Sequence, residues 1–167
     1  MFEIGDYLIY GSTGVCRVEA VGILQGISSA DPNRQYYTLT PIYGAGTIYT
    51  PVDGKVFMRP VLTKAEAEEL IDRIPEIRED ACKGVDQRSM ANQYQSFIQS
   101  HRCEDLVELI KSIYQKNQAM LRNGKKAAMT DKQYMKKAEH LLHGELAIAL
   151  DIPLEEVAGY IADKIGK

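Results

Sequence analysis

Cysteine is scarce in this sequence, and its spacing excludes two kinds of small stabilised domain. The chain of 167 residues contains three cysteines, Cys16, Cys82 and Cys103. Because their number is odd and no two are close in sequence, they are typical neither of a disulfide framework nor of a zinc site built from cysteine pairs. We therefore expect no structural metal and no cofactor.

The sequence also lacks the features of a signal peptide and of a membrane-spanning segment. The opening stretch, Met-Phe-Glu-Ile-Gly-Asp-Tyr, has neither the basic start nor the apolar centre of a signal peptide. No apolar run approaches the roughly 20 residues that are needed to cross a bilayer. We expect a soluble, cytoplasmic protein with no membrane partner.

Positive charge is in slight deficit overall, but it is unevenly distributed. The formal net charge is −3, which by itself argues against a nucleic-acid-binding protein. From Lys111 to Lys137, however, there are eight basic residues and one acid, Asp131, whereas residues 62–110 hold eleven acids and six bases. Such asymmetry is typical of a basic binding surface or of a solvated helix face, and the sequence leaves both open.

The first third of the chain is typical of a small antiparallel sheet. Segments rich in Val, Ile, Tyr and Thr, which suit a pleated surface, are separated by turn residues. Five short strands in so short a segment suit an SH3- or Tudor-like barrel, in which closure removes most exposed edges. The expected strands cover residues 7–10, 15–24, 36–42, 47–52 and 56–58.

Gly11 and Gly14 lie between the first two of these segments. A phosphate-binding loop needs a helix after its glycines, so that backbone N–H groups face the anion. Here alternating valines follow, and no Gly-Lys-Ser/Thr is present. The sequence therefore predicts a hairpin turn and no phosphate site.

Helical periodicity begins near Leu62. A Thr-x-x-Glu capping box at 63–66 predicts a helix that ends at Pro75, and further helices are expected at about 86–100 and from about Glu104. Gly124 breaks the third helix, a second capping box at 130–133 opens a fourth, and residues 151–156 begin a fifth. The buried face expected on the third helix consists of Leu106, Leu109, Ile110, Ile113, Tyr114 and Asn117.

These periods predict an α+β protein with two domains. Residues 1–61 are expected to form the SH3/Tudor-like β-barrel, and residues 62–167 an all-α helical bundle. Tyrosines of the barrel could fill its core or form an exposed binding face, and the sequence leaves both open. They are Tyr7, Tyr10, Tyr36, Tyr37, Tyr43 and Tyr49.

His140 and His143 are the strongest candidates for enzyme chemistry. Their spacing on a helix can chelate a metal. The His-Glu-x-x-His order of zinc hydrolases is absent, however, and no nucleophile motif is visible. We expect no enzyme and no metal; a small hydrolase or metal enzyme at these histidines is a third and weakest hypothesis.

Four segments in the same order carry a resemblance to a known family. "GDYLIYGSTGVCRVEAV" (5–21) resembles the Gly-Asp-x-Val-Val-Tyr/His-x-x-x-Gly-x-x-x-Val opening of CarD/CdnL proteins and of the RNA-polymerase-interacting domain of transcription-repair coupling factors. "YYTLTPIYGAGTIYTPVDG" (36–54) is similar to the family's next strands. "LVELIKSIYQKNQ" (106–118) and "KAEHLLHGELAIAL" (137–150) are similar to its helices.

The resemblance implies a bacterial transcription regulator. In this family the barrel docks on the β subunit of RNA polymerase through an extended strand, which here corresponds to Thr47, Ile48, Tyr49 and Thr50. An exposed edge strand can accept a partner strand through main-chain hydrogen bonds. Many relatives have an arginine where this chain has Tyr49, so a charge pair with the polymerase is missing.

On the DNA side the chain departs from the family. Relatives stabilise the open promoter complex with a tryptophan that enters the minor groove, but this sequence has no tryptophan, and the position falls near Asp86. Arg88 matches a basic neighbour of that wedge, so DNA contact would depend on Arg88, Lys125 and Lys126. Phosphate contacts of this kind are salt-dependent and insensitive to sequence.

Two hypotheses for function follow. The first is a regulator that binds the RNA polymerase β subunit and contacts upstream promoter DNA, modulating open-complex stability. The second is a protein–protein adaptor that binds RNA polymerase or another protein without contacting DNA, which the acidic balance and the absent tryptophan favour.

Overall fold

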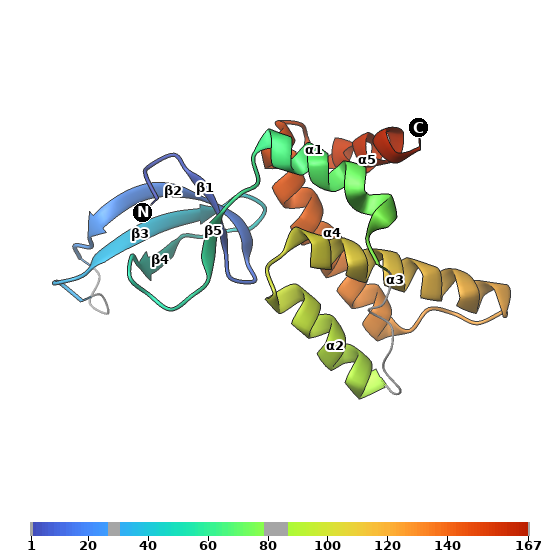
Figure 1. Ribbon diagram of the computed structural model, residues 1–167. Helices are drawn as coiled ribbons and strands as arrows, with labels where there is room; N and C mark the ends of the chain where they lie inside the picture. Colours follow the sequence, from blue (N-terminus) through green and yellow to red (C-terminus); the bar gives the residue numbers. More distant parts are fainter. Residues whose placement is uncertain (1, 27–30, 79–86, 167) are drawn as a thin grey trace. The chain divides into compact units, whose positions relative to one another are not determined.

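The protein consists of two compact units. The computed structural model in Figure 1 describes residues 2–26, 31–78 and 87–166. The chain divides at Val61 into a unit of strands, Met1–Val61, and a unit of helices, Leu62–Lys167. The predicted α+β class is therefore confirmed.

The first unit is a five-stranded antiparallel sheet. Strands neighbour one another in the order β4-β3-β2-β1-β5, and each neighbouring pair is antiparallel. A bulge between Val18 and Ala20 interrupts the register of β2 with β3, and such an extra residue bends a strand. The strands are β1 (Tyr7–Tyr10), β2 (Gly14–Ile23), β3 (Gln35–Pro41), β4 (Ile48–Pro51) and β5 (Met58–Pro60).

The strand order leaves β4 and β5 at the two edges. Within the described residues no β4–β5 pairing joins these edges, so closure into a barrel stays a prediction. The fifth strand lies two residues later than predicted and ends at Pro60, opposite Leu8 of β1. A proline, which lacks an N–H, is tolerated in an edge strand because its outer side needs no ladder donor.

The glycine stretch between β1 and β2 is a hairpin turn, as predicted. Tyr10 pairs with Gly14, and the Thr13 N–H donates to the Tyr10 carbonyl at 3.0 Å. Gly11 and Gly14 have φ angles of +48° and +98°, which residues with a Cβ rarely adopt. A strand follows the turn, so the loop presents no helix N-terminus to a phosphate.

The tyrosines of the sheet divide between its core and its surface. Tyr36 and Tyr37 are buried, whereas Tyr7 and Tyr49 are exposed; part of the set therefore fills the core, and a binding face formed by the exposed tyrosines stays a prediction. Burial raises the pKa of the Cys16 thiol to about 11, so this cysteine packs as a small apolar group. The core consists of Leu8, Cys16, Val18, Tyr37 and Leu39.

The second unit is helical, with boundaries close to those predicted (Figure 1). The capping box at the start of α1 is present: Thr63 Oγ1 accepts the Glu66 N–H at 3.1 Å, and Glu66 Oε1 accepts the Thr63 N–H at 2.9 Å. The helices are α1 (Lys64–Arg73), α2 (Gln87–Gln99), α3 (Cys103–Arg122), α4 (Met129–Leu150) and α5 (Val157–Ile165), with short 3-10 turns η1 (Ile74–Glu76) and η2 (Leu154–Glu156).

The helices share one apolar core. Of the six residues predicted on α3, Leu106, Leu109 and Ile113 are buried, Ile110 and Asn117 are half-buried, and Tyr114 is 56% exposed. Cys103, Val107 and Ser112 are also buried but were not predicted. Beyond Ile113 no residue of α3 is buried, so the last turns of this helix extend past the packed core. The core includes Leu70 and Ile71 of α1, Tyr94 and Ile98 of α2, Leu109 and Ile113 of α3, Leu142 and Leu146 of α4, and Val157 of α5.

A buried carboxylate connects the start of this unit to α3 and α4. Glu145 of α4 is 1% exposed. Its Oε2 accepts the Leu62 N–H at 2.9 Å, and its Oε1 accepts the Cys103 thiol at 3.2 Å. Since a buried carboxylate without such donors is costly, these hydrogen bonds fix where the chain enters the helical unit.

The second capping box, predicted at 130–133, is wrong. α4 begins at Met129, two residues earlier than a cap at Thr130 would place it, and has no side-chain cap. Asp131 is instead buried: its Oδ1 accepts the Tyr94 hydroxyl of α2 at 2.9 Å, and its Oδ2 lies 2.9 Å from Nζ of Lys116 on α3. Partners on two other helices, which the local sequence does not reveal, therefore decide the role of this carboxylate.

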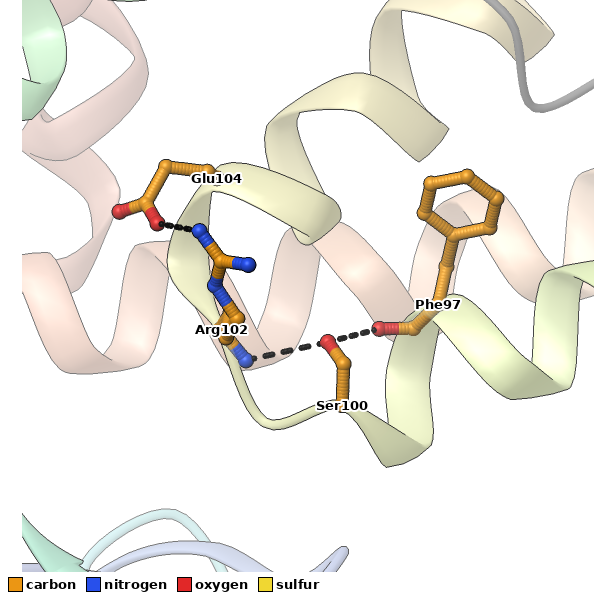
Figure 2. Close-up of polar contacts among 4 residues, drawn as sticks. All are labelled: Phe97, Ser100, Arg102 and Glu104. Atoms are coloured by element: carbon orange, nitrogen blue, oxygen red, sulfur yellow. Dashed lines mark hydrogen bonds and ion pairs between the residues drawn. The ribbon is translucent and has the colours of Figure 1, made fainter.

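The turn from α2 to α3 is held by side-chain contacts (Figure 2). The Ser100 hydroxyl donates to the Phe97 carbonyl at 2.9 Å and accepts the Arg102 N–H at 3.2 Å, while Arg102 Nη2 lies 3.1 Å from Glu104 Oε2. His101 has a φ of +59°. These contacts fix the direction in which α3 continues from the end of α2.

Candidate protein-binding and nucleic-acid-binding surfaces

The predicted docking residues lie at an edge of the sheet. Ile48, Tyr49 and Thr50 belong to β4, and Thr47 immediately precedes it. Tyr49 is 47% exposed, whereas Thr50 is 2% exposed. The strand therefore has an exposed side chain that a partner can contact and a buried one that anchors it to the sheet.

Hydrogen bonding to β3 uses alternate residues of β4 and its continuation. The Val52 N–H donates to the Gln35 carbonyl at 2.9 Å. In an antiparallel ladder every second residue turns its N–H and C=O towards the same neighbour. By this alternation Ile48 and Thr50 face β3, while the N–H and C=O of Tyr49 point away from it.

No strand pairs with the outer side of β4 in the described part of the sheet, although the Pro51 carbonyl on that side accepts the Gly54 N–H at 3.0 Å. Pro51 follows Tyr49 by two residues, and its missing N–H also falls on this outer side. An edge of this kind can be extended by a strand of another chain, which supplies main-chain hydrogen bonds to the unpaired groups.

An ion pair closes the end of the β3–β4 pair. Arg34, just before β3, and Asp53, just after β4, approach to 2.8 Å between Nη2 and Oδ1. The hydrogen bond from Arg34 lowers the pKa of the Asp53 carboxyl below its ordinary value. Both groups are exposed, so the pair adds little stability. It joins the start of β3 to the segment just after β4, at the end of this strand pair.

The basic cluster of the helical unit divides into internal and exposed cations. Lys111 Nζ donates to the carbonyls of Ile74 and Ile77 at 2.7 and 2.8 Å, and Lys116 pairs with the buried Asp131. The others are exposed, and within the described residues none of them is in an ion pair. They are Arg122, Lys125, Lys126, Lys132, Lys136 and Lys137.

Two of the predicted DNA-binding residues, Lys125 and Lys126, lie in the loop between α3 and α4. Gly124 has a φ of +71°, and its N–H donates to the Leu121 carbonyl at 3.1 Å. The Lys125 N–H donates to the Met120 carbonyl at 2.8 Å. A left-handed glycine with bonds back into the last turn is a common way to end a helix, and here it holds both lysines in an exposed loop.

Two exposed apolar residues flank this loop. Leu121 is 63% exposed and Met129 is 68% exposed. Neither is among the residues predicted from the sequence. The signal that could have indicated them is their place around the basic stretch Arg-Asn-Gly-Lys-Lys (122–126): Leu121 immediately precedes it, and Met129 follows it by three residues.

Arg88, the third predicted DNA-binding residue, is exposed in the first turn of α2. Asp86, at the position of the family's wedge, lies outside the described residues. Arg88 and the two lysines belong to different elements, and no hydrogen bond or ion pair joins them within the described residues. The structure therefore presents them as two separate basic positions of the helical unit.

The arrangement of the first unit, with an antiparallel sheet, a tight Gly-Ser-Thr-Gly hairpin and an unpaired β4 edge, can be compared with known families. Residues 2–62 match the family model of the CarD-like/TRCF RID domain. The resemblance to the CarD/CdnL family is thereby confirmed over the sheet unit. RID domains interact with RNA polymerase and are protein-interaction domains without catalytic activity.

The match to the RID domain ends at residue 62, where the helical unit begins. No curated protein matches the chain. None of the helices in the described ranges is long and apolar enough to cross a membrane.

His140 and His143, the candidate metal ligands, lie at a surface depression of about 540 Å³. Burial lowers the pKa of His143 below its ordinary value, and Glu139 opposes this shift. Across residues 2–26, 31–78 and 87–166 no three His, Cys, Asp or Glu side chains are grouped so that they could hold a metal ion. The depression is lined by Gln133, Lys136, Lys137, Glu139, His140, His143 and Leu154.

Proposed function

We propose that this protein is a non-enzymatic bacterial transcription regulator that acts in the cytoplasm. Its RID domain binds the β subunit of RNA polymerase, and its helical unit contacts upstream promoter DNA and modulates open-complex stability. The observation that carries the proposal is the unpaired outer edge of β4, which lies in a domain whose family interacts with RNA polymerase.

The docking mode follows from the alternation of the ladder. A strand of the β subunit pairs with the outward N–H and C=O of Tyr49, and the exposed Tyr49 ring adds apolar and aromatic contact. Thr47, Ile48 and Thr50 complete the docking strand. In this proposal the sheet curls into a partly open SH3/Tudor-like barrel, and its β4 edge stays free for the partner strand to extend.

DNA contact uses exposed cations. Lys125 and Lys126 in the α3–α4 loop, together with Arg88 on α2, neutralise phosphates near the upstream edge of the promoter bubble. Because these residues contact the backbone, binding depends strongly on salt and little on sequence.

A pair of substitutions at one position tests the docking mode. Tyr49→Pro removes the outward N–H without removing a donor to β3, whereas Tyr49→Ala removes the ring and keeps the N–H. Binding of the full chain to the isolated β-subunit lobe is measured for both. We expect Tyr49→Pro to weaken binding about tenfold or more, since a net hydrogen bond is lost and the strand can no longer be extended, and Tyr49→Ala to weaken it less. Equal, unchanged binding by both variants would contradict strand addition at β4.

Salt dependence tests the DNA contact. The full chain is titrated with a fork-junction duplex at two salt concentrations, as wild type and as Lys125→Gln/Lys126→Gln. Each phosphate contact contributes about 0.9 to the slope of log K against log salt, so we expect the variant to lose up to about two units of slope. Lys55→Gln, in the sheet unit, is the control for charge alone.

The adaptor hypothesis gives a different outcome. It predicts polymerase binding through β4, with no DNA binding by the protein alone or within the polymerase complex. A wild-type chain that binds the β lobe but leaves the promoter footprint unchanged would support the adaptor and overturn the DNA half of the proposal.

A further inference from the structure

The α3–α4 tip, defined here as Leu121–Met129, combines features that a purely solvated loop does not need. Leu121 and Met129 are 63% and 68% exposed, more than any other large apolar side chain of the helical unit in the described residues. Figure 1 shows the end of α3 and the following loop extending beyond the rest of the helical unit. Contact between apolar side chains this exposed and water is unfavourable, and covering them with a partner lowers the free energy.

The tip has a defined backbone. The Asn123 N–H donates to the Met120 carbonyl at 3.1 Å, and the N–H groups of Gly124 and Lys125 donate to carbonyls of the last turn of α3. Lys116 and the buried Asp131 pair at 2.9 Å behind it and connect the two helices that carry the tip. A surface held in this way loses little conformational freedom on binding.

The charge around the tip is of one sign. Arg122, Lys125, Lys126 and Lys132 are exposed. From residue 109 to 138 the sequence contains a single acid, Asp131, which is buried and paired. A partner that complements this surface therefore carries negative charge opposite the cations. It also offers apolar surface that can cover Leu121 and Met129.

Nucleic acid meets this description better than a lipid surface does. Membrane-surface helices bury a long apolar face, because their affinity scales with apolar area, and this tip offers two side chains. Leu and Met are among the residues that enter the space between bases, where one or two side chains are enough and flanking cations hold the phosphates.

We infer that the α3–α4 tip places Leu121 and Met129 against unstacked bases at the edge of a DNA bubble, while Lys125 and Lys126 hold the flanking phosphates. This inference rests on the proposed DNA contact and goes beyond it, because it assigns base-contacting residues at a position other than Asp86. Entry between bases costs least where pairing is already broken, so the tip distinguishes a fork junction from a closed duplex.

The test uses the full chain and a fork-junction duplex with 2-aminopurine at the first unpaired position. Leu121→Gln/Met129→Gln keeps side-chain length and removes the apolar ends. We expect this variant to bind the fork about tenfold more weakly, to bind the closed duplex with less than about a twofold change, and to lose the fluorescence rise that reports unstacking. Its salt dependence stays that of the wild type, because the lysines are intact.

The control is Ile165→Gln, an exposed apolar residue on α5, which we expect to leave fork binding and fluorescence unchanged. If the wild type binds DNA and Leu121→Gln/Met129→Gln binds the fork equally well with the same fluorescence, the inference is overturned and the phosphate contact stands. If the wild type binds neither the fork junction nor the closed duplex, the proposed DNA contact and the inference about the tip both fail. Sedimentation with phosphatidylglycerol vesicles that depends on Leu121 and Met129, without an effect on fork binding, also overturns it.

Discussion

Asp131 lies almost fully buried, with the Tyr94 hydroxyl at 2.9 Å on one carboxylate oxygen and the Lys116 ammonium at 2.9 Å from the other. Each of the three residues comes from a different helix. A buried carboxylate without partners is costly, so the contacts that offset its desolvation also fix how α2, α3 and α4 meet. Lys116 is partly exposed, which limits the strength of the ion pair.

Removing this carboxylate should destabilise the helical unit. Asp131→Ala leaves the Tyr94 hydroxyl buried without its acceptor, and we expect it to lower the free energy of unfolding by about 1–3 kcal/mol. Tyr94→Phe removes the hydroxyl and leaves Oδ1 of the buried Asp131 without this donor, so we expect a comparable loss of about 1–3 kcal/mol. Urea denaturation measures both. An Asp131→Ala variant as stable as the wild type would mean that the network adds nothing.

The pH dependence of stability should reveal His143. Burial lowers its pKa below the ordinary 6.5, so the unfolded chain binds a proton at higher pH than the folded one. The stability that this group contributes is therefore fully present above about pH 6.5 and is lost as the pH falls towards the folded pKa. Between about pH 7.5 and pH 5.5 the Tm of the wild type should fall more than that of His143→Gln.

Direct titration checks the assignment. The NMR titration of the His143 ring should give a midpoint below 6.5 in the folded protein. A midpoint at or above this value, or equal Tm changes in wild type and His143→Gln, would show that burial of this ring does not control the acid limb of stability.

At the scale of elements, local chemistry predicted most of the boundaries. The capping box at Thr63 and Glu66 and the left-handed Gly124 are decided by nearby backbone groups, and the structure has both. The pattern at 130–133 is as good a capping box in sequence, but burial of Asp131 against two other helices overrides it. Tyr114 follows the apolar period of α3, yet it is exposed because the helix has passed the core.

The candidate binding surfaces likewise include features that the sequence predicts and features that depend on tertiary structure. The segment proposed to dock was predicted from its resemblance to a family, and β4 covers Ile48, Tyr49 and Thr50 of that segment. Which backbone groups point outward depends on the register with β3, which a single strand does not reveal. The exposure of Leu121 and Met129 likewise depends on where neighbouring helices end, so composition alone could not indicate these residues.

The capping box offers a prediction at this scale. Thr63→Ala removes the oxygen that accepts the Glu66 N–H, and such losses typically cost about 1 kcal/mol. Thr63→Ser keeps the oxygen and is the matched control. Thermal unfolding should show a lower Tm for Thr63→Ala and nearly the wild-type Tm for Thr63→Ser. Equal Tm values for the two variants would mean that the methyl group, and not the cap, is what matters.

At the scale of the whole molecule, the described residues form two apolar cores that share no residue. Leu39 belongs to the sheet core and Leu109 to the helical core, and each is fully buried. If residues 1–61 and 62–167 are domains in the energetic sense, a cavity in one core should destabilise that unit and leave the other intact. Under the proposed function, in which the chain binds both polymerase and DNA, such independence lets each surface stay formed while the other is occupied.

Matched cavity variants test this division. Leu39→Ala and Leu109→Ala each remove the same atoms from a buried site, at a cost of about 2–5 kcal/mol. Hydrogen exchange followed by mass spectrometry should show lost protection in the sheet for the first variant and in the helices for the second. Under the proposed function, Leu109→Ala then keeps β-lobe binding while weakening DNA contact, because the β4 edge stays folded and the α3–α4 tip does not. Loss of protection throughout the chain with either variant would mean that it folds as one unit, and that its two surfaces cannot act separately.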